Sequence, residues 1–459
     1  MHVEPSRLKT FHICPSFCYL EEIKSKRLDM IDRKQFLKRM GGTAAAMTVA
    51  PFLNLETSEA VAKDLKQYPG SPDEIARNED FWYTVQHAFT VDRSLINLNN
   101  GGVSPAPEMV QSSMNRHLDS MNEAPVYTMW KVLEPQKEAV RQRIAGNFGV
   151  DPEEIAITRN ASEGLQICQF GFDLERGDEV LTTTHDYPRM INTFKQRERR
   201  EGIKLKQFSL PIPAEDDDEI VRLFEENITP NTKLILMCHI INITGQILPV
   251  KKVVNMAREK GIPVIVDGAH SYAHWDFDHS DLDCDYYATS LHKWLFAPIG
   301  SGMLFVKKDK IEDLWPLMAA PEQKSDDIRK FEEIGTHPIA NFLAIAEALT
   351  FHQTIGPARK GARMKYLTDV WVNRLIDHEN FVLHTSRDPK YACGIATAQI
   401  KGVDSRDLSN YLWDEHHILV TPIMHAEFEG IRVTPNVYTT MEELDRFSMA
   451  MQDVLKNGL

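Results

Sequence analysis

The sequence lacks the features that would place it in a specialised class of protein. It contains no apolar run near the roughly 20 residues that span a bilayer, so we expect no membrane partner. Its formal net charge of -14 over 459 residues argues against a nucleic-acid partner, because such binding depends on neutralising phosphates. It shows no internal repeat, no Walker lysine and no dinucleotide glycine pattern. The composition is that of an ordinary globular chain, long enough for two or three domains.

Cysteine is scarce as well, with six in the whole chain. Cys14 and Cys18 lie close together but have no second pair and no histidine tail, so zinc binding is not indicated. The other four stand singly in apolar or strand-like contexts, where a small buried hydrophobe is expected: Cys168, Cys238, Cys284 and Cys393. The spacing indicates no disulfide framework.

The first 62 residues have the pattern of an export signal. Asp32 to Lys38 precedes a weakly apolar stretch from Gly41 to Leu53, and Ala60-Val61-Ala62 offers a small-residue cleavage site. The pattern resembles a twin-arginine signal in which Lys34 stands where the second arginine normally lies. We therefore expect a periplasmic protein. A floppy or amphipathic tail on a cytoplasmic protein is the alternative.

Residues 63–95 should form a polar linker followed by a helix. The apolar face of this helix would carry Phe81, Trp82, Val85 and Phe89. Residues 96–102 then indicate a short strand that ends in a cluster of turn-forming residues. Turn chemistry alone explains the cluster, and a substrate-entrance loop is the alternative.

Strands and helices alternate through the middle of the chain. Predicted strands cover residues 154–158, 179–183, 204–209, 233–239, 264–266, 285–289 and 303–306, and predicted helices cover 162–168, 190–200, 216–226 and 250–260. This alternation predicts an α/β fold with a mostly parallel sheet covered by helices on both faces. Ligands of such sheets bind at the carboxyl ends of the strands.

A smaller α/β unit is expected at the C-terminus. Its predicted strands are 394–400, 418–420 and 430–433, and its predicted helices, 405–415 and 441–456, would cover one face. We therefore divide the folded chain into a large domain, residues 96–354, and a small C-terminal domain, residues 355–459, that closes over a cleft.

An acid and a lysine follow two neighbouring predicted strands. Asp267 ends the apolar run 264–266, and Lys293 follows the run 285–289. This pair is what a pyridoxal phosphate site needs, because the lysine forms an imine with the cofactor and the carboxylate keeps the ring nitrogen protonated. The helix start at Ala161 and Ser162 could present backbone amides to a phosphate, although ordinary helix capping also explains it.

Several histidines cluster around the same segment. His270, His274, His279 and His292 could suggest a metal site, together with neighbouring aspartates. A regular helix is not expected through Trp275, so the spacing that a helical metal site requires is missing. We expect no metal.

At these positions the chain resembles the class V aminotransferase family of fold-type I pyridoxal phosphate enzymes, most closely its isopenicillin N epimerase-like branch. The resemblance runs from Phe81 to the C-terminus, and its most specific motif is Ser290-Leu291-His292-Lys293. It implies that Lys293 is the Schiff-base lysine and that Asp267 pairs with the pyridine nitrogen. It further implies cofactor contacts from Ala161, Ser162, Ser290 and His292 to the phosphate, from His270 to the ring hydroxyl, from Tyr187 (or, less favoured, His185) stacked on the ring, and from Asn242 near the substrate.

Two further matches lie beyond the predicted large sheet. Gly335-Thr336 resembles the turn that reaches the phosphate of the partner subunit, which implies a homodimer with shared active sites. Arg432 begins a motif, Arg432-Val433-Thr434-Pro435, that resembles the one binding the substrate carboxylate, a task suited to a two-pronged guanidinium.

The resemblance implies an enzyme acting at the α-carbon of an amino acid, most simply an aminotransferase or an epimerase. Lys293 would be the general base and Arg432 would orient the carboxylate. Racemisation needs a second group on the opposite face, for which Tyr187 is the candidate. Cysteine desulfurases, the best-known neighbours in this family, carry a nucleophilic cysteine on a loop shortly before the carboxylate-binding arginine. Residues 418–431 of this chain contain no cysteine, so desulfuration is disfavoured. A carbon–carbon or carbon–sulfur lyase and a cofactor-binding protein without turnover are the alternatives.

Overall fold

The computed structural model describes residues 68–459 of the chain. The predicted export signal, Cys14 and Cys18 lie outside the described residues. Within residues 68–459, no helix is long and apolar enough to cross a membrane.

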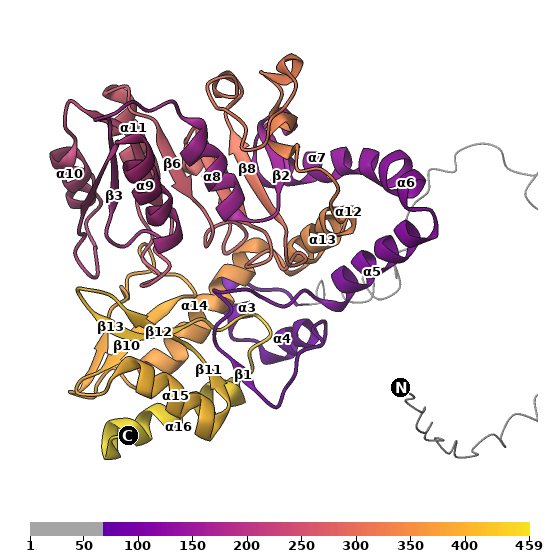
Figure 1. The fold of residues 1–459 in the computed structure, drawn as a ribbon. Helices are drawn as coiled ribbons and strands as arrows, with labels where there is room; N and C mark the ends of the chain where they lie inside the picture. Colours follow the sequence, from indigo (N-terminus) through magenta and orange to yellow (C-terminus); the bar gives the residue numbers. More distant parts are fainter. Residues whose placement is uncertain (1–67) are drawn as a thin grey trace, which may run out of the picture. The chain divides into compact units, whose positions relative to one another are not determined.

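A mixed seven-stranded sheet forms the larger layer of the fold (Figure 1). Its order is β2-β8-β7-β6-β5-β3-β4, in which β7, β6, β5, β3 and β4 run parallel and β8 runs antiparallel to both of its neighbours. The strands are β2 (Ile155–Thr158), β3 (Glu179–Thr183), β4 (Lys204–Phe208), β5 (Thr232–Cys238), β6 (Val264–Asp267), β7 (Tyr286–Ser290) and β8 (Gly302–Val306). The predicted α/β fold with a mostly parallel sheet is confirmed.

Helices cover both faces of this sheet, because successive strand residues point to opposite sides. Ile265 belongs to a core formed with α8 (Ala161–Gly171) and α9 (Pro188–Glu201). Val264 and Val266 belong to a second core on the other face. That core includes α7 (Lys137–Phe148), α10 (Asp217–Asn227), α11 (Val250–Glu259), α12 (Ile339–Leu343) and α13 (Ile345–Ile355).

Local sequence signals explain where the helices beside the sheet begin. The Asn160 side chain caps α8 by accepting a hydrogen bond from the amide of Glu163, 2.9 Å away. Pro188 stands in the first turn of α9, where its missing N–H costs nothing, and Gly202 ends that helix in a left-handed conformation. These signals fix where α8 and α9, the helices that follow β2 and β3, begin and where α9 ends.

A second, antiparallel sheet of order β12-β13-β10-β9 lies in the C-terminal region (Figure 1). Its strands are β9 (Phe381–Leu383), β10 (Ala396–Ile400), β12 (Thr421–Met424) and β13 (Glu429–Val433), and it shares a core with α14 (Pro357–Asn373), α15 (Ser405–His416) and α16 (Met441–Asn457). Strands β9 and β12 are absent from the sequence prediction. Both are short, and Pro422 within β12 is atypical of a strand interior.

The N-terminal part of the described chain packs against this C-terminal region. Strand β1 (Ile96–Asn97) pairs in parallel with β11 (Ile418–Leu419). Phe81, Trp82 and Val85 lie buried in α4 (Glu79–Gln86), but Phe89 lies beyond the end of this helix, against Phe296 and Phe351. The predicted helix is therefore shorter than expected. The division into domains at residue 354 stays a prediction.

The remaining helical segments are short connections, apart from α5. They are α3 (Pro72–Ala76), α5 (Glu108–Glu123), α6 (Pro125–Tyr127), the π-helix η1 (Thr128–Leu133) and the 3-10 helices η2 (Glu134–Gln136), η3 (Pro152–Glu154), η4 (His279–Asp281), η5 (Lys308–Lys310), η6 (Glu322–Lys324) and η7 (Ile328–Glu332).

Gly268 allows β6 and β7 to approach each other closely at their carboxyl ends. A Cβ atom at this position would lie 2.0 Å from Cζ of the buried Tyr287 ring. The Gly268 amide donates to the Ala288 carbonyl at 2.9 Å, and the Gly268 carbonyl accepts from the Thr289 hydroxyl at 2.8 Å. The backbone here is therefore fixed on both sides.

We predict that Gly268→Ala lowers the free energy of unfolding by about 3 kcal/mol, because a rigid buried ring must move to admit the methyl group. Gly146→Ala is the matched control, since a Cβ there meets nothing within 4 Å on α7. It should raise stability by about 0.5–1 kcal/mol through reduced backbone entropy. Denaturant midpoints of the two variants and the wild type measure both effects. Equal midpoints for the two variants would contradict the close approach.

Candidate active site

A cavity of 360 Å³ opens where the parallel strands of the large sheet end. Loops that follow β2, β3, β5, β6 and β7 contribute to its wall, as expected for a sheet of this kind. The lining residues are Gly102, Asn160, Ala161, Ser162, Leu165, Tyr187, Arg189, Cys238, Ile240, Asn242, Asp267, Ala269, His270, Ser290, His292 and Lys293.

Asp267 and Lys293 bring opposite charges to this cavity. Burial raises the pKa of the Asp267 carboxyl to about 6, while the Ala269 amide, a 2.9 Å donor, and Lys293 oppose the rise. Burial also lowers the pKa of Lys293 to about 8, and Asp267 opposes this shift while Arg432 adds to it. At neutral pH the acid is therefore mostly ionised, and a substantial fraction of the amine is neutral.

His270 lines the cavity beside Lys293. Its Nε2 lies 3.2 Å from Nζ of Lys293. Burial, and the charge of Lys293, hold the pKa of His270 well below its usual value, so the ring is neutral. Its Nδ1 is buried and has no hydrogen-bond partner among the described residues. A buried ring nitrogen of this kind is available to a bound ligand.

One end of the cavity gathers hydrogen-bonding groups at the start of α8. The Ser290 hydroxyl accepts from the amide of Ala161 at 3.0 Å, which ties the end of β7 to the helix start. His292 Nδ1 bonds to the Ser301 carbonyl at 3.0 Å, leaving Nε2 for the cavity. Burial, with help from Lys293, lowers the pKa of His292 to about 4. Because Nδ1 donates to a carbonyl, Nε2 of the neutral His292 ring is an acceptor, and this ring donates to an anion only when it is protonated. The Ser290 hydroxyl and the positive end of α8 are the groups here that can bind an anion without a change of protonation.

Arg432 on β13 is a buried cation without a carboxylate partner among the described residues. Its Nη1 donates to the Asn242 carbonyl at 3.1 Å, and its Nη2 donates to Asn99 Oδ1 at 2.9 Å. Its Nε is buried and unpartnered. Burial lowers the pKa of Arg432 to about 10, although Tyr187 opposes the shift, so the side chain stays charged at neutral pH. Because Asn242 lines the cavity, the bond to its carbonyl places Arg432 beside the cavity.

The turn that carries Asn242 is held by the small sheet. Gly245 has a φ of +76°, and a Cβ there would lie 2.1 Å from the Ile395 carbonyl oxygen. The Thr397 hydroxyl donates to the Ile243 carbonyl at 2.6 Å. Asn242 Oδ1 is buried and unpartnered among residues 68–459. The amide side chain is therefore fixed in position with an unused acceptor.

The structure brings most of the predicted site residues together. Ten of them line the cavity or lie beside it: Ala161, Ser162, Tyr187, Asn242, Asp267, His270, Ser290, His292, Lys293 and Arg432. Thr336 is exposed and does not line the cavity of its own chain. His185 is buried outside the cavity wall, where its Nε2 pairs with Glu427.

Sequence reasoning missed several cavity residues. Cys238, expected only as a buried hydrophobe, lines the wall at the end of β5. Burial holds the pKa of its thiol well above the usual value, with Asp186 and Asp267 adding to the rise. Arg189 also lines the cavity, from the first turn of α9. Gly102 does so from the loop for which a substrate entrance was the alternative explanation. The cluster of turn-forming residues within 96–102 was the one sequence signal that pointed to Gly102.

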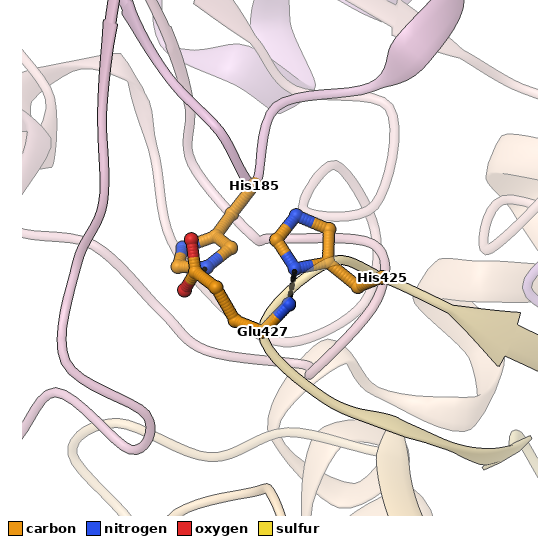
Figure 2. A group of neighbouring side chains, drawn as sticks. All are labelled: His185, His425 and Glu427. Atoms are coloured by element: carbon orange, nitrogen blue, oxygen red, sulfur yellow. Dashed lines mark hydrogen bonds and ion pairs between the residues drawn. The ribbon is translucent and has the colours of Figure 1, made fainter.

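His185, His425 and Glu427 form a cluster near the cavity, with ligand-type atoms within 4.8 Å of one another (Figure 2). Each of these side chains is already hydrogen-bonded. His185 Nε2 pairs with Glu427 at 3.0 Å, and His425 uses Nε2 on the Thr184 carbonyl and Nδ1 on the Glu427 amide. These bonds account for the arrangement without a cation.

Comparison with known proteins agrees with this geometry. The family profile described as Aminotransferase class-V matches residues 96–447. The isopenicillin N epimerase of Streptomyces clavuligerus is 28% identical over 387 residues, which cover 81% of this chain and 97% of the relative. A probable cysteine desulfurase of Synechocystis sp. is 25% identical over 401 residues, covering 79% and 91% respectively.

The fold is shared with solved structures. One is a lysine-to-alanine mutant of C-DES with glycine covalently linked to its PLP cofactor, with a TM-score of 0.71, 23% identity, and coverage of 80% of this chain and 99% of that one. A second structure of the same protein, named there as a cystine C–S lyase in complex with its product cysteine persulfide, has a TM-score of 0.70, 23% identity and coverage of 79% and 98%.

We predict that the Lys293 amine reacts with aldehydes at a lower pH than a surface lysine does. Its pKa of about 8 leaves roughly one molecule in ten deprotonated at pH 7, far more than for an ordinary lysine with a pKa of about 10.4. The protein is first treated with hydroxylamine, which removes any cofactor aldehyde bonded to the lysine. Reductive methylation across a pH series should then show labelling of Lys293 that rises through pH 8. Peptide mass spectrometry measures it.

Lys390 is the matched control, because a hydrogen bond to Asp217 raises its pKa. Asp267→Asn removes a charge that holds the Lys293 pKa up, so it should move the labelling of Lys293 to lower pH. Labelling of Lys293 and Lys390 with the same pH profile would show that the cavity does not perturb the lysine.

Proposed function

The chain belongs to the class V aminotransferase family, and we propose that it is an enzyme that moves a proton at the α-carbon of an amino acid. The cofactor is pyridoxal 5′-phosphate. The observation that carries the proposal is Arg432, a buried guanidinium without a carboxylate partner in the described chain, beside a lysine whose pKa is lowered to about 8. A site with a free cation and a neutral amine suits a substrate that has a carboxylate next to a carbon acid.

The residues of the cavity fit the cofactor. Ser290 and the start of α8 at Ser162 would hold the phosphate, because they offer a hydroxyl and a backbone amide at a helix N-terminus. His292 would join them through Nε2 in its protonated form, which the charge of a bound phosphate favours. The Ala161 amide already donates a hydrogen bond to the Ser290 hydroxyl, so Ala161 would act on the phosphate only through that hydroxyl. Asp267 would accept a hydrogen bond from the protonated ring nitrogen. His270 Nδ1 and Asn242 Oδ1 have no hydrogen-bond partner among residues 68–459, and they would serve the ring and the substrate.

When bound, the pyridine ring withdraws electrons from the α-carbon, and this makes its proton acidic. Lys293 would hold the cofactor until the amino group of the substrate takes its place, and the freed Nζ would then accept the proton, a task for which a pKa of about 8 is well matched. Asp267 keeps the ring nitrogen protonated. Arg432 binds the carboxylate and so fixes which bond of the α-carbon faces Lys293.

We propose Tyr187 as the residue that packs on the open side of the ring. It lines the cavity and is 37% exposed. Epimerisation needs a proton donor on the face opposite Lys293, and Tyr187 is the candidate. Amino transfer needs only Lys293, because one base can carry the proton between two carbons. Both are compatible with these residues, and the similarity to isopenicillin N epimerase supports the first.

A carbon–sulfur lyase is the second candidate, favoured by the similarity to C-DES and to desulfurases. It would use the same lysine and arginine. Desulfuration through a cysteine nucleophile is less well supported. The buried Cys393 donates to the Gly245 carbonyl, and the pKa of Cys393 is raised by burial to about 12. The Cys238 thiol is likewise neutral.

We propose that the active unit is a homodimer in which Thr336 serves the partner's site. Its exposed position, away from its own cavity, supports this assignment. Export to the periplasm is a further proposal, which rests on residues 32–62 of the sequence alone.

We predict that one class of amino acid changes the visible absorption of the bound cofactor and exchanges its α-proton in heavy water. Interconversion of the L and D forms would identify an epimerase, and an oxoacid that keeps the whole side chain would identify an aminotransferase. Release of sulfide from cysteine, or of cysteine persulfide from cystine, would identify a lyase. Lys293→Ala is the control that should leave the substrate unlabelled. No spectral change with any common amino acid or cysteine derivative, at millimolar concentration, would contradict an enzyme of this class.

We also predict that Arg432→Gln weakens the binding of the responding amino acid by about 100-fold, because charge-assisted bonds to the carboxylate are lost. Arg432→Lys should recover only part of this, since an ammonium cannot form two parallel bonds. Spectral titration measures the dissociation constants. The exposed Arg387 provides the control substitution, Arg387→Gln, which should change nothing. Unchanged affinity in Arg432→Gln would remove the carboxylate assignment.

A further inference from the structure

The turn between β12 and β13 is bonded to the loops that follow β3 and β4. We call this set of residues the hairpin latch: Thr184, His185, Ser209, His425 and Glu427. The hydroxyls of Thr184 and Ser209 donate to Glu427 Oε1, the first at 3.0 Å. His185 Nε2 contacts Glu427 Oε2 at 3.0 Å, and His425 Nε2 contacts the Thr184 carbonyl at 3.0 Å. More than 200 residues of chain separate the two sides of these bonds.

The latch centres on one carboxylate. Figure 2 shows the Glu427 side chain lying against the His185 ring, with His425 on the same turn. His185 is 1% exposed. Although partial burial opposes it, the hydrogen bonds from Ser209 and His185 hold the pKa of Glu427 below its usual value, so it is ionised at neutral pH. Both oxygens of this carboxylate are therefore engaged by donors from the large sheet's loops.

Each side of the latch leads directly to a residue of the cavity. On one side, Tyr187 follows His185 by two positions and lines the cavity wall. On the other, Glu427 precedes β13, which carries Arg432. Arg432 in turn donates to the carbonyl of Asn242, another residue of the cavity wall. The bonds of Glu427 thus connect the two segments that carry Tyr187 and Arg432.

We propose that Glu427 is a positioning residue that sets the separation of Tyr187 and Arg432, and through them the affinity for the substrate carboxylate. The role in affinity rests on the proposed function. The role in holding the hairpin does not, because it concerns contacts within the chain. Glu427 lies outside the cavity wall and touches neither Lys293 nor Asp267, so its loss leaves the proton-transfer groups in place.

Two substitutions separate a positioning role from a general loss of stability. Glu427→Ala removes all the bonds to the carboxylate, whereas Glu427→Gln keeps an oxygen acceptor for Thr184 and Ser209 and an amide opposite His185. Glu415→Ala, at an exposed glutamate of α15, is the matched control. Hydrogen exchange of the holoenzyme, followed by mass spectrometry, reports on residues 421–433 and 184–190. Spectral titration with the responding amino acid reports on affinity, and steady-state rates report on turnover.

We expect Glu427→Ala to speed amide exchange in residues 421–433 by about tenfold and to raise the dissociation constant about tenfold, with kcat changed by less than about threefold. Glu427→Gln should restore most of both. Exchange in Glu427→Ala equal to that of wild type would overturn the latch. Faster exchange with unchanged affinity would overturn the positioning role.

Two controls keep the outcomes distinct. If no amino acid changes the wild-type spectrum, the proposed function fails, and the exchange of residues 421–433 still decides whether the latch exists. Dialysis against EDTA should leave exchange unchanged, because hydrogen bonds alone engage the cluster. Exchange that rises on chelation and falls again on adding zinc would overturn a latch made of hydrogen bonds alone.

Discussion

The chemistry proposed for this protein depends on holding a lysine amine out of water beside a carboxylate. Burial alone would lower the pKa of Lys293 further and raise that of Asp267 further than it does, and each group partly restrains the shift of the other. The two lie together because β6 and β7 are adjacent parallel strands whose carboxyl ends meet at one edge. Gly268 allows the close contact of these ends, since any side chain there would enter the Tyr287 ring. Strand order and one glycine thus fix the electrostatics of the site.

Much of the large domain's architecture could be read from the sequence because its signals are local. Apolar runs of four or five residues, followed by capped helices, predicted the parallel strands to within about two residues. The acid–lysine pair needed only the rule that ligands meet the carboxyl ends of such strands. The same rule, applied to the helix start at Ser162, predicted which end of the cavity would hold a phosphate.

The residues that escaped prediction are those whose role comes from distant parts of the chain. Asn99 bonds to Arg432 across more than 300 residues, and Glu427 bonds to His185 across 242. Arg189 stands in an ordinary first helical turn, and nothing in its neighbourhood indicates that it faces the cavity. The short strand β12 was hidden by its proline. Such contacts depend on how the small sheet packs against the loops of the large one, which local patterns do not encode.

The burial of Arg432 has a consequence for the thermal stability of the protein. A charged guanidinium held between the Asn242 carbonyl and Asn99, with its Nε unsatisfied, costs folding free energy that a surface arginine would not. With the proposed role of Arg432, a small carboxylate that enters the folded cavity would relieve this cost, and the unfolded chain would gain nothing comparable. The melting temperature should therefore be higher in acetate or formate than in chloride. The size of the rise with each carboxylate would rank these ions by affinity before any turnover is known.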